Sequence, residues 1–239
     1  MDDLSFWVSK NADFMPNKTA IRFEGQDITY SEFDRQIRIY ARTLKHSFGV
    51  VPGDRVAFLG VNTPSLLYTF FACARLGAIF SPLNWRLTPP EHRFMLQDSG
   101  AKLLISDEEF RANADTIRDD IPDCTLVAND FEDAAWRSLA AELAGSEGDD
   151  SNPDVTPDMP FMLVYTSGTT GRPKGAVLTQ HNMQIHAYNS VHYSQMSMHD
   201  HILTVLPMFH VGGLNIQTVP AFYAGATVIM HRRFDPQAT

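Results

Sequence analysis

The stretch that does most to decide the fold reads YTSGTTGRPKG and runs from residue 165 to residue 175. An apolar strand candidate over residues 161–166 leads directly into it. The stretch combines three glycines, four aliphatic hydroxyl side chains, one arginine and one lysine. Glycines let backbone N–H groups approach an anion closely, and the hydroxyls and the lysine add further donors. The pattern predicts a polyphosphate-binding loop at the end of a buried strand.

The two commonest nucleotide-binding motifs do not account for this stretch. A Walker A loop needs Gly-Lys after four intervening residues, and counting from Gly168 places Pro173 where the glycine should stand. The dinucleotide fingerprint GxGxxG does not occur in the chain. The remaining alternative is a flexible Gly/Ser/Thr turn that binds no ligand.

The sequence around this stretch carries clear helix signals. Thr29 and Glu32 form a capping-box pattern, and apolar residues then recur at three- and four-residue spacing over residues 33–48. Gly49 follows as a stop signal. These features predict an amphipathic helix.

Strand and helix candidates alternate along the rest of the chain. The strand candidates span residues 56–59, 78–83, 101–105, 124–128, 161–166, 202–206 and 227–230. The helix candidates span residues 63–77, 88–99, the segment from about 107, and 179–196. Such alternation predicts an α/β fold with layered, parallel-rich sheets and flanking helices.

The composition is that of a folded globular chain. The 239 residues are 44% hydrophobic and 20% charged, which excludes a disordered or collagen-like protein and predicts one or two domains. The formal net charge is −9. A chain this acidic lacks the basic surface that nucleic-acid backbones require, so no nucleic-acid partner is expected.

The cysteines and the apolar segments bear on location. The chain has two cysteines, Cys73 and Cys124, which is too few for a disulfide framework and favours a reducing compartment. The most apolar window, residues 66–80, is too short for a membrane span and contains Arg75. The N-terminus lacks the apolar core of a signal peptide. We therefore expect a cytoplasmic protein without a transmembrane segment, and peripheral membrane association stays open.

Residues 145–158 differ from the rest in composition. Gly, Ser, Asp, Asn and Pro dominate the segment, and five of its 14 residues are acidic. This composition predicts a solvated loop or a subdomain boundary, with Asp149 and Asp150 as solvated charges.

Residues 165–175 resemble the phosphate-binding signature of the adenylate-forming superfamily, which includes acyl-CoA synthetases, nonribosomal peptide adenylation domains and firefly luciferase. Two further segments resemble that family in the same order: GAIFSPLNWRLT at residues 77–88 and PMFHVGGL at residues 207–214. The resemblance covers essentially the whole chain, and the third segment is most similar to fatty-acyl- and aryl-CoA ligases.

The resemblance implies a two-step reaction. A carboxylate attacks the α-phosphorus of ATP to give an acyl-adenylate and pyrophosphate, and the thiol of coenzyme A then takes the acyl group. Mg²⁺ would help to neutralise the charge, with Thr166 as a candidate contact. The positions matching the family's phosphate-binding residues are Thr166, Ser167, Gly168, Thr169, Thr170, Gly171 and Lys174.

The third segment would serve the acyl group. His210 matches the family's gate between the nucleotide and acyl pockets, the alternative being a satisfied core histidine. Gly212 and Gly213 would bring the backbone close to the acyl group. Asn84 and Glu91 are expected to order their loop and helix start, as is Arg86, and Arg172 lies at a variable position with no assigned role.

The family's catalytic lysine and C-terminal domain have no match in residues 1–239. We therefore expect the chain to be the N-terminal portion of the AMP-binding domain of an acid–thiol ligase, inactive alone, with no catalytic residue assigned. The alternative is a non-catalytic nucleotide-binding or structural unit. A sheet cut partway would expose an apolar face, which predicts self-association.

Overall fold

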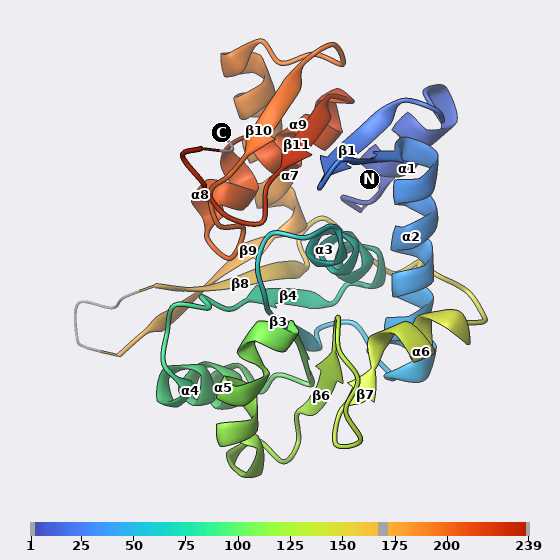
Figure 1. Ribbon diagram of the computed structural model, residues 1–239. Coiled ribbons are helices and arrows are strands. Elements are labelled where there is room, and N and C mark those ends of the chain that lie inside the picture. The colour runs from blue at the N-terminus through green and yellow to red at the C-terminus, as the bar shows by residue number, and fades with distance from the viewer. Residues whose placement is uncertain (1–2, 167–171, 238–239) are drawn as a thin grey trace.

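The computed structural model describes residues 3–166 and 172–237, which form two β-sheets with helices packed between and around them (Figure 1). The larger sheet has seven strands in the order β7 (Arg137–Ser138), β6 (Thr125–Ala128), β5 (Leu103–Ser106), β3 (Arg55–Leu59), β4 (Ile79–Pro82), β8 (Pro160–Thr166) and β9 (Lys174–Thr179). The smaller sheet has the order β10 (His201–Thr204), β11 (Thr227–Met230), β1 (Thr19–Phe23) and β2 (Gln26–Thr29).

The α-helices are α1 (Phe6–Phe14), α2 (Tyr30–Arg42), α3 (Pro64–Leu76), α4 (Pro89–Ser99), α5 (Arg111–Thr116), α6 (Leu139–Ala144), α7 (Gln180–Ser194), α8 (Val211–Gly213) and α9 (Val219–Ala224). Short 3₁₀ turns lie at Glu108–Phe110 and Arg118–Asp120, and π-helical turns at Thr43–Ser47 and Leu214–Thr218. No helix in the described ranges is long and apolar enough to cross a membrane.

Two hydrophobic cores cover the two faces of the seven-stranded sheet. Val56 and Phe58 of β3 point into a core that includes α3 and the smaller sheet, whereas Ala57 and Leu59 point into a second core under α4 and α5. Because side chains alternate along a strand, a strand buried on both faces reads as a continuous apolar run. The predicted α/β fold with parallel-rich sheets and flanking helices is confirmed.

The helix α3 runs between the two sheets and matches the predicted helix at residues 63–77. Thr63 caps its start by accepting a hydrogen bond from the Leu66 N–H, and Gly77 ends it in the left-handed conformation with φ of 72°. Phe70 packs edge-to-face against Phe80 and Phe161, with ring centroids 5.5 and 4.7 Å apart. The aromatic contacts fix α3 against the large sheet.

Two antiparallel pairs depart from the predicted parallel arrangement. β1 and β2 form an antiparallel hairpin, and β9 pairs antiparallel with β8. The sequence did not predict β9, because most of its residues are exposed and show no apolar alternation. An edge strand that buries little leaves a weak pattern in the sequence.

The acidic segment at residues 145–158 is pinned to the helices beside it. Asp150 accepts two hydrogen bonds from the Arg75 guanidinium, at 2.6 and 3.0 Å, and also lies near Arg38 and Arg42. The interpretation of Asp150 as a solvated charge is therefore wrong. Its partners come from α2 and α3, whose position beside this segment is a tertiary feature that local composition does not encode.

The side chain of Asn62 joins the two sheets. Its amide nitrogen donates to the backbone oxygens of Leu206 and His231, at 3.0 and 3.1 Å, and its oxygen accepts from the Met208 N–H at 2.8 Å. Asn62 follows β3 of the large sheet, whereas its partners follow β10 and β11 of the small sheet. One buried amide thus fixes the carboxyl ends of both sheets relative to each other.

Candidate functional site

The segment that carries the polyphosphate prediction forms a hairpin at the edge of the large sheet. β8 and β9 extend away from the body of the molecule, and Thr166 pairs with Lys174 in their register (Figure 1). The Thr166 hydroxyl donates to the Lys174 backbone oxygen at 3.4 Å. Both side chains are exposed. The five predicted residues between them, Ser167, Gly168, Thr169, Thr170 and Gly171, lie outside the described residues.

The Lys174 ammonium of this hairpin is available to a ligand. The Lys174 ammonium forms no ion pair with any residue in the part of the chain that the structure describes. An unpaired lysine beside an exposed hydroxyl is suited to an oxyanion. The described part of the hairpin therefore fits the phosphate prediction, while the full set of seven residues remains a prediction.

Residues 84–92 form a rigid corner beside the hairpin. The Glu91 carboxylate accepts hydrogen bonds from the Thr88 N–H and hydroxyl at 2.8 and 2.7 Å, and these bonds hold the pKa of Glu91 below its usual value. Asn84 accepts a hydrogen bond from the Arg86 N–H at 3.0 Å. Glu91 and Asn84 thus order the helix start and its loop, as expected.

A histidine that the sequence analysis missed supports this corner. His92 is buried, and its Nε2 lies 2.9 Å from the Asn84 backbone oxygen. Burial lowers the pKa of His92, so the ring is neutral at pH 7 and Nε2 carries the proton that it donates. The only sequence signal was its position one residue after the capping glutamate.

Stacked rings and cations brace the same corner. The Arg86 and Arg233 guanidinium carbons lie 4.9 and 4.6 Å from the centre of the Trp85 ring, and Phe209 meets that ring edge-to-face at 5.8 Å. Each cation–π contact is worth about 0.5–1 kcal/mol at exposed sites. Phe209 belongs to the third segment, so this stack links residues 77–88 to residues 207–214.

His210 begins the short helix α8. Its Nδ1 accepts a hydrogen bond from the Gly212 N–H at 3.0 Å, so Nε2 is the ring nitrogen that carries a proton. The side chain is exposed, so the alternative of a core histidine is wrong. Gly213 is buried, and a Cβ atom built there would lie 2.2 Å from the Pro207 backbone oxygen. Only glycine fits this close approach.

A cavity of about 520 Å³ unites the three segments. Its walls include Asn84 and Leu87 from the first segment, Thr166 and Pro173 from the second, and His210 and Val211 from the third. Gly212 and Gly213 line a separate hollow of about 60 Å³. Segments distant in sequence thus meet around one ligand-sized space with mainly apolar walls.

The family model for AMP-binding enzymes matches residues 8–239. This chain belongs to the AMP-binding enzyme family. Relatives of this chain include an indoleacetate–CoA ligase of Aromatoleum aromaticum, 48% identical over 99% of the chain and 46% of the relative. A feruloyl-CoA synthase of Amycolatopsis is 39% identical over 98% of the chain and 45% of the relative. The chain spans about half the length of these curated relatives.

Solved structures share the fold of this chain. The N-terminal domain of FACL13 from Mycobacterium tuberculosis matches with a TM-score of 0.86 and 28% identity, over 98% of this chain and 58% of that one. The o-succinylbenzoate CoA synthetase of Bacillus subtilis, solved with an acyl-adenylate intermediate, matches with a TM-score of 0.82 and 28% identity, over 97% and 45%. The described strands and helices therefore have the arrangement found in acyl-CoA synthetases.

Proposed function

We propose that this chain supplies the phosphate-binding part of an AMP-forming acid–thiol ligase. A carboxylate oxygen attacks the α-phosphorus of ATP, and pyrophosphate leaves. The sulfur of coenzyme A then attacks the acyl carbon, and AMP leaves. The observation that carries the proposal is the cavity that Asn84, Thr166 and His210 share, because it joins three segments that each resemble this family.

Thr166 and Lys174 hold the β- and γ-phosphates in this proposal, together with residues 167–171. The exposed Lys174 ammonium supplies an unpaired positive charge, and the Thr166 hydroxyl supplies a neutral oxygen beside it. A hydroxyl oxygen is a ligand type that Mg²⁺ accepts alongside phosphate oxygens. Mg²⁺ bound there would neutralise charge on the phosphates.

His210 separates the nucleotide from the acid in this proposal. The bond from the Gly212 N–H to Nδ1 fixes the orientation of the ring, so that its Nε2–H is free to donate to a carboxylate or phosphate oxygen. The exposed ring forms part of the cavity wall. Gly212 and Gly213, which line the separate hollow, are therefore not assigned a contact with the acyl group.

An aromatic carboxylic acid is the substrate class that we favour over a fatty acid. The two relatives described above are named for indoleacetate and ferulate, both aromatic acids. A fatty acid–carrier protein ligase of Streptomyces coeruleorubidus is also similar, at 38% identity. The aromatic preference thus rests on the more similar relatives.

The cytoplasmic location stays a prediction, supported by two buried free thiols at Cys73 and Cys124.

The test is acid-dependent exchange of pyrophosphate into ATP, measured on the longest reading frame that contains residues 1–239. We expect exchange with indole-3-acetate and ferulate, and weaker exchange with palmitate. Loss of a preorganised charged donor at a reacting centre costs about a hundred-fold in rate, so Lys174→Ala should reduce exchange by about that factor.

Arg172→Ala is the matched control for Lys174→Ala, since Arg172 is an exposed cation two residues away with no assigned role. It should change exchange less than about two-fold, because an exposed charge outside the site contributes little. Absence of acid-dependent exchange would overturn the ligase proposal in favour of a non-catalytic nucleotide-binding or structural unit. Equal loss in both variants would overturn the role of Lys174.

A further inference from the structure

Tyr165 connects the phosphate-binding hairpin to helix α4. Its hydroxyl lies 2.7 Å from a carboxylate oxygen of Asp98, to which it donates, and 3.3 Å from the Met95 backbone oxygen. Its ring meets Phe94 edge-to-face, with centroids 6.4 Å apart. Burial, followed by the hydrogen bond to Asp98, raises the pKa of the Tyr165 hydroxyl, which therefore remains a donor at pH 7. The contact joins the end of β8 to the last turn of α4.

Asp98 is poorly placed for the stability of its own helix. It lies in the last turn of α4, where the negative end of the helix dipole disfavours a carboxylate, and that turn contains no basic residue. Asp98 forms no salt bridge with any described residue. The hydrogen bond from Tyr165 is the contact that offsets this unfavourable position.

The other end of α4 is held just as firmly. Its first turn carries the Thr88–Glu91 capping box, and His92 binds the Asn84 backbone. The helix therefore spans from the corner at Asn84 to the end of β8 at Tyr165, and both of these residues line the shared cavity. Because α4 is anchored at both ends, it fixes the distance between the Asn84 corner and the Tyr165 end of β8.

Tyr165 also determines how the end of β8 is turned. Successive side chains of a strand point to opposite faces, so anchoring Tyr165 on α4 sets the direction of the Thr166 side chain next to it. Gly175 lies opposite Tyr165 in the register of β8 and β9. A Cβ atom at Gly175 would lie 2.7 Å from the Leu163 methyl and 3.5 Å from the Tyr165 ring, so the absence of a side chain leaves room for both. The hairpin end is thus built around this tyrosine.

We propose that Tyr165 is a positioning residue, which acts through Asp98 of α4 to hold Thr166 and Lys174 in the orientation that receives the phosphates of ATP. The proposal rests on the proposed function for its kinetic readout. It concerns the hydrogen bond from Tyr165 to Asp98, and not a contact between a ligand and the Tyr165 side chain, which also lines the shared cavity.

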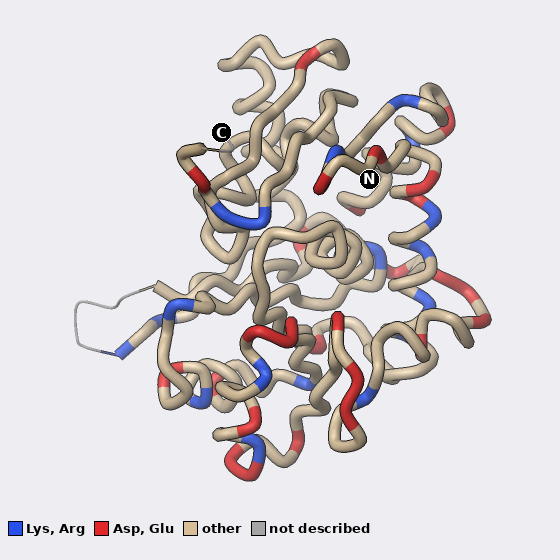
Figure 2. Tube along the Cα trace, in the orientation of Figure 1, with Lys and Arg blue, Asp and Glu red and all other residues tan. Residues whose placement is uncertain are grey.

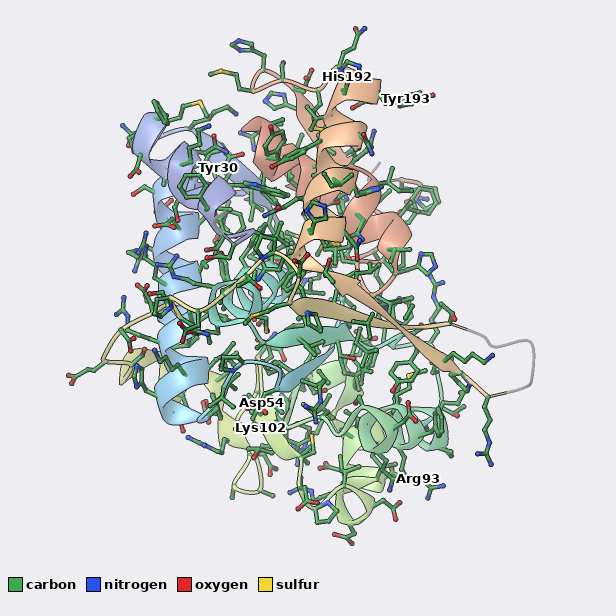
Figure 3. All side chains as sticks on the ribbon, turned by 180° about the vertical axis from the view of Figure 1, so that it is seen from behind. Tyr30, Asp54, Arg93, Lys102, His192 and Tyr193 are labelled. Atoms are coloured by element: carbon green, nitrogen blue, oxygen red, sulfur yellow. The ribbon has the colours of Figure 1, made fainter. Side chains whose placement is uncertain are left out.

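The kinetic test compares Tyr165→Phe, Asp98→Ala and the double variant. Each single variant should raise the KM for ATP about five-fold, the ratio expected from one net hydrogen bond, with little change in the KM for the acid. The double variant should match the single ones, because both remove the same bond. Tyr193→Phe is the matched control, since Tyr193 is 92% exposed and projects from the end of α7 (Figure 3).

A second readout does not depend on the reaction. Amide hydrogen exchange of β8 and β9 should become faster in Tyr165→Phe and Asp98→Ala, and should stay at the wild-type rate in Tyr193→Phe. Additive effects of the two single variants, an equal rise in both KM values, or unchanged hydrogen exchange would each overturn the proposal. If the wild type shows no acid-dependent exchange of pyrophosphate but hydrogen exchange responds as expected, the ligase function fails while the anchoring by Tyr165 stands.

Discussion

At the scale of single residues, the buried carboxylate of Asp107 carries a free-energy cost of desolvation. The side chain is buried, with 2% of its surface exposed. It accepts hydrogen bonds from the Asn129 amide at 2.7 Å and from the Val61 N–H at 2.9 Å. Burial nevertheless dominates and raises the pKa of Asp107 to about 6. The carboxylate ties the carboxyl ends of β3, β5 and β6 together through these two hydrogen bonds.

A pH dependence of stability follows from this shift. The pKa of Asp107 in the folded state lies above the value of about 3.9 for an unfolded chain. The folded state therefore binds this proton more tightly, and the resulting stability is present below about pH 4 and lost as the pH rises through about 6. The free energy of unfolding should fall over this range by up to about 1.4 kcal/mol per pH unit from this group.

Urea denaturation of the wild type and of Asp107→Asn, at a series of pH values from about 4 to 7, measures this contribution. The difference between the two proteins isolates Asp107, because their other titrating groups are the same. Parallel pH profiles would show that the carboxyl does not titrate in this range.

At the scale of elements, the sequence predicts what is encoded locally. The capping box of α2 at Thr29 and Glu32 is confirmed, as are the helix α3 between Thr63 and Gly77 and the strand β11. These features depend on residues within a few positions of one another. By contrast, the edge strand β9 and the π-helical turn at Leu214–Thr218 depend on tertiary packing. No apolar periodicity in the sequence predicts them.

The candidate site divides in the same way. The stretch at residues 165–175, for which phosphate binding is predicted, and the residue His210 were singled out because their motifs are contiguous in sequence. The bond between Tyr165 and Asp98, and the stack of Trp85 on Arg233, join residues from different elements. Such pairs are fixed by tertiary packing, so a single sequence does not reveal them.

The paired glycines of the third segment allow a prediction about the join between β10 and α8. A Cβ atom at Gly213 would lie 2.2 Å from the Pro207 oxygen, whereas one at Gly212 would come no closer than 3.2 Å, to a ring atom of His210. Gly213→Ala should therefore lower the free energy of unfolding by about 1–3 kcal/mol, the usual range for overpacking. Gly212→Ala should lower the free energy of unfolding by less than half as much.

Thermal unfolding of both glycine variants measures the difference. A midpoint several degrees lower for Gly213→Ala than for Gly212→Ala is expected for a chain of this size. Equal midpoints would show that the backbone around Pro207 adjusts without cost.

At the scale of the whole molecule, charge is distributed unevenly. Between residues 175 and 230, Asp200 is the single Asp, Glu, Lys or Arg. Figure 2 shows the consequence, with few charged residues along α7 and β10 and many around α4 and α5. Leu203, Leu206 and Ile216 are each more than 40% exposed and surround one hollow beside the edge strand β10. An exposed strand edge with apolar neighbours favours association.

We predict that the 239-residue chain self-associates through the β10 edge. Light scattering after size exclusion should give a mass above that of the monomer, and the mass should rise with concentration. Leu203→Lys should restore the monomer, because a lysine on an edge strand opposes strand pairing. Val51→Lys, at a 55% exposed position just before β3 of the other sheet, is the control that should leave the mass unchanged. A monomeric wild type at high concentration would contradict the prediction.

The pairing of β1 with β11 has a consequence for the order of folding during synthesis. Ile21 stands opposite Val228, and Asn62 binds backbone groups that follow β10 and β11. The ribosome releases β1 early, yet the strand has no parallel neighbour until residue 230 has emerged. The large sheet, complete at Thr179, can close well before that. Contacts of such long range form slowly and leave a strand edge open in the meantime. The hairpin of β1 and β2, although made first, therefore joins the rest of the small sheet only after β11 has been made.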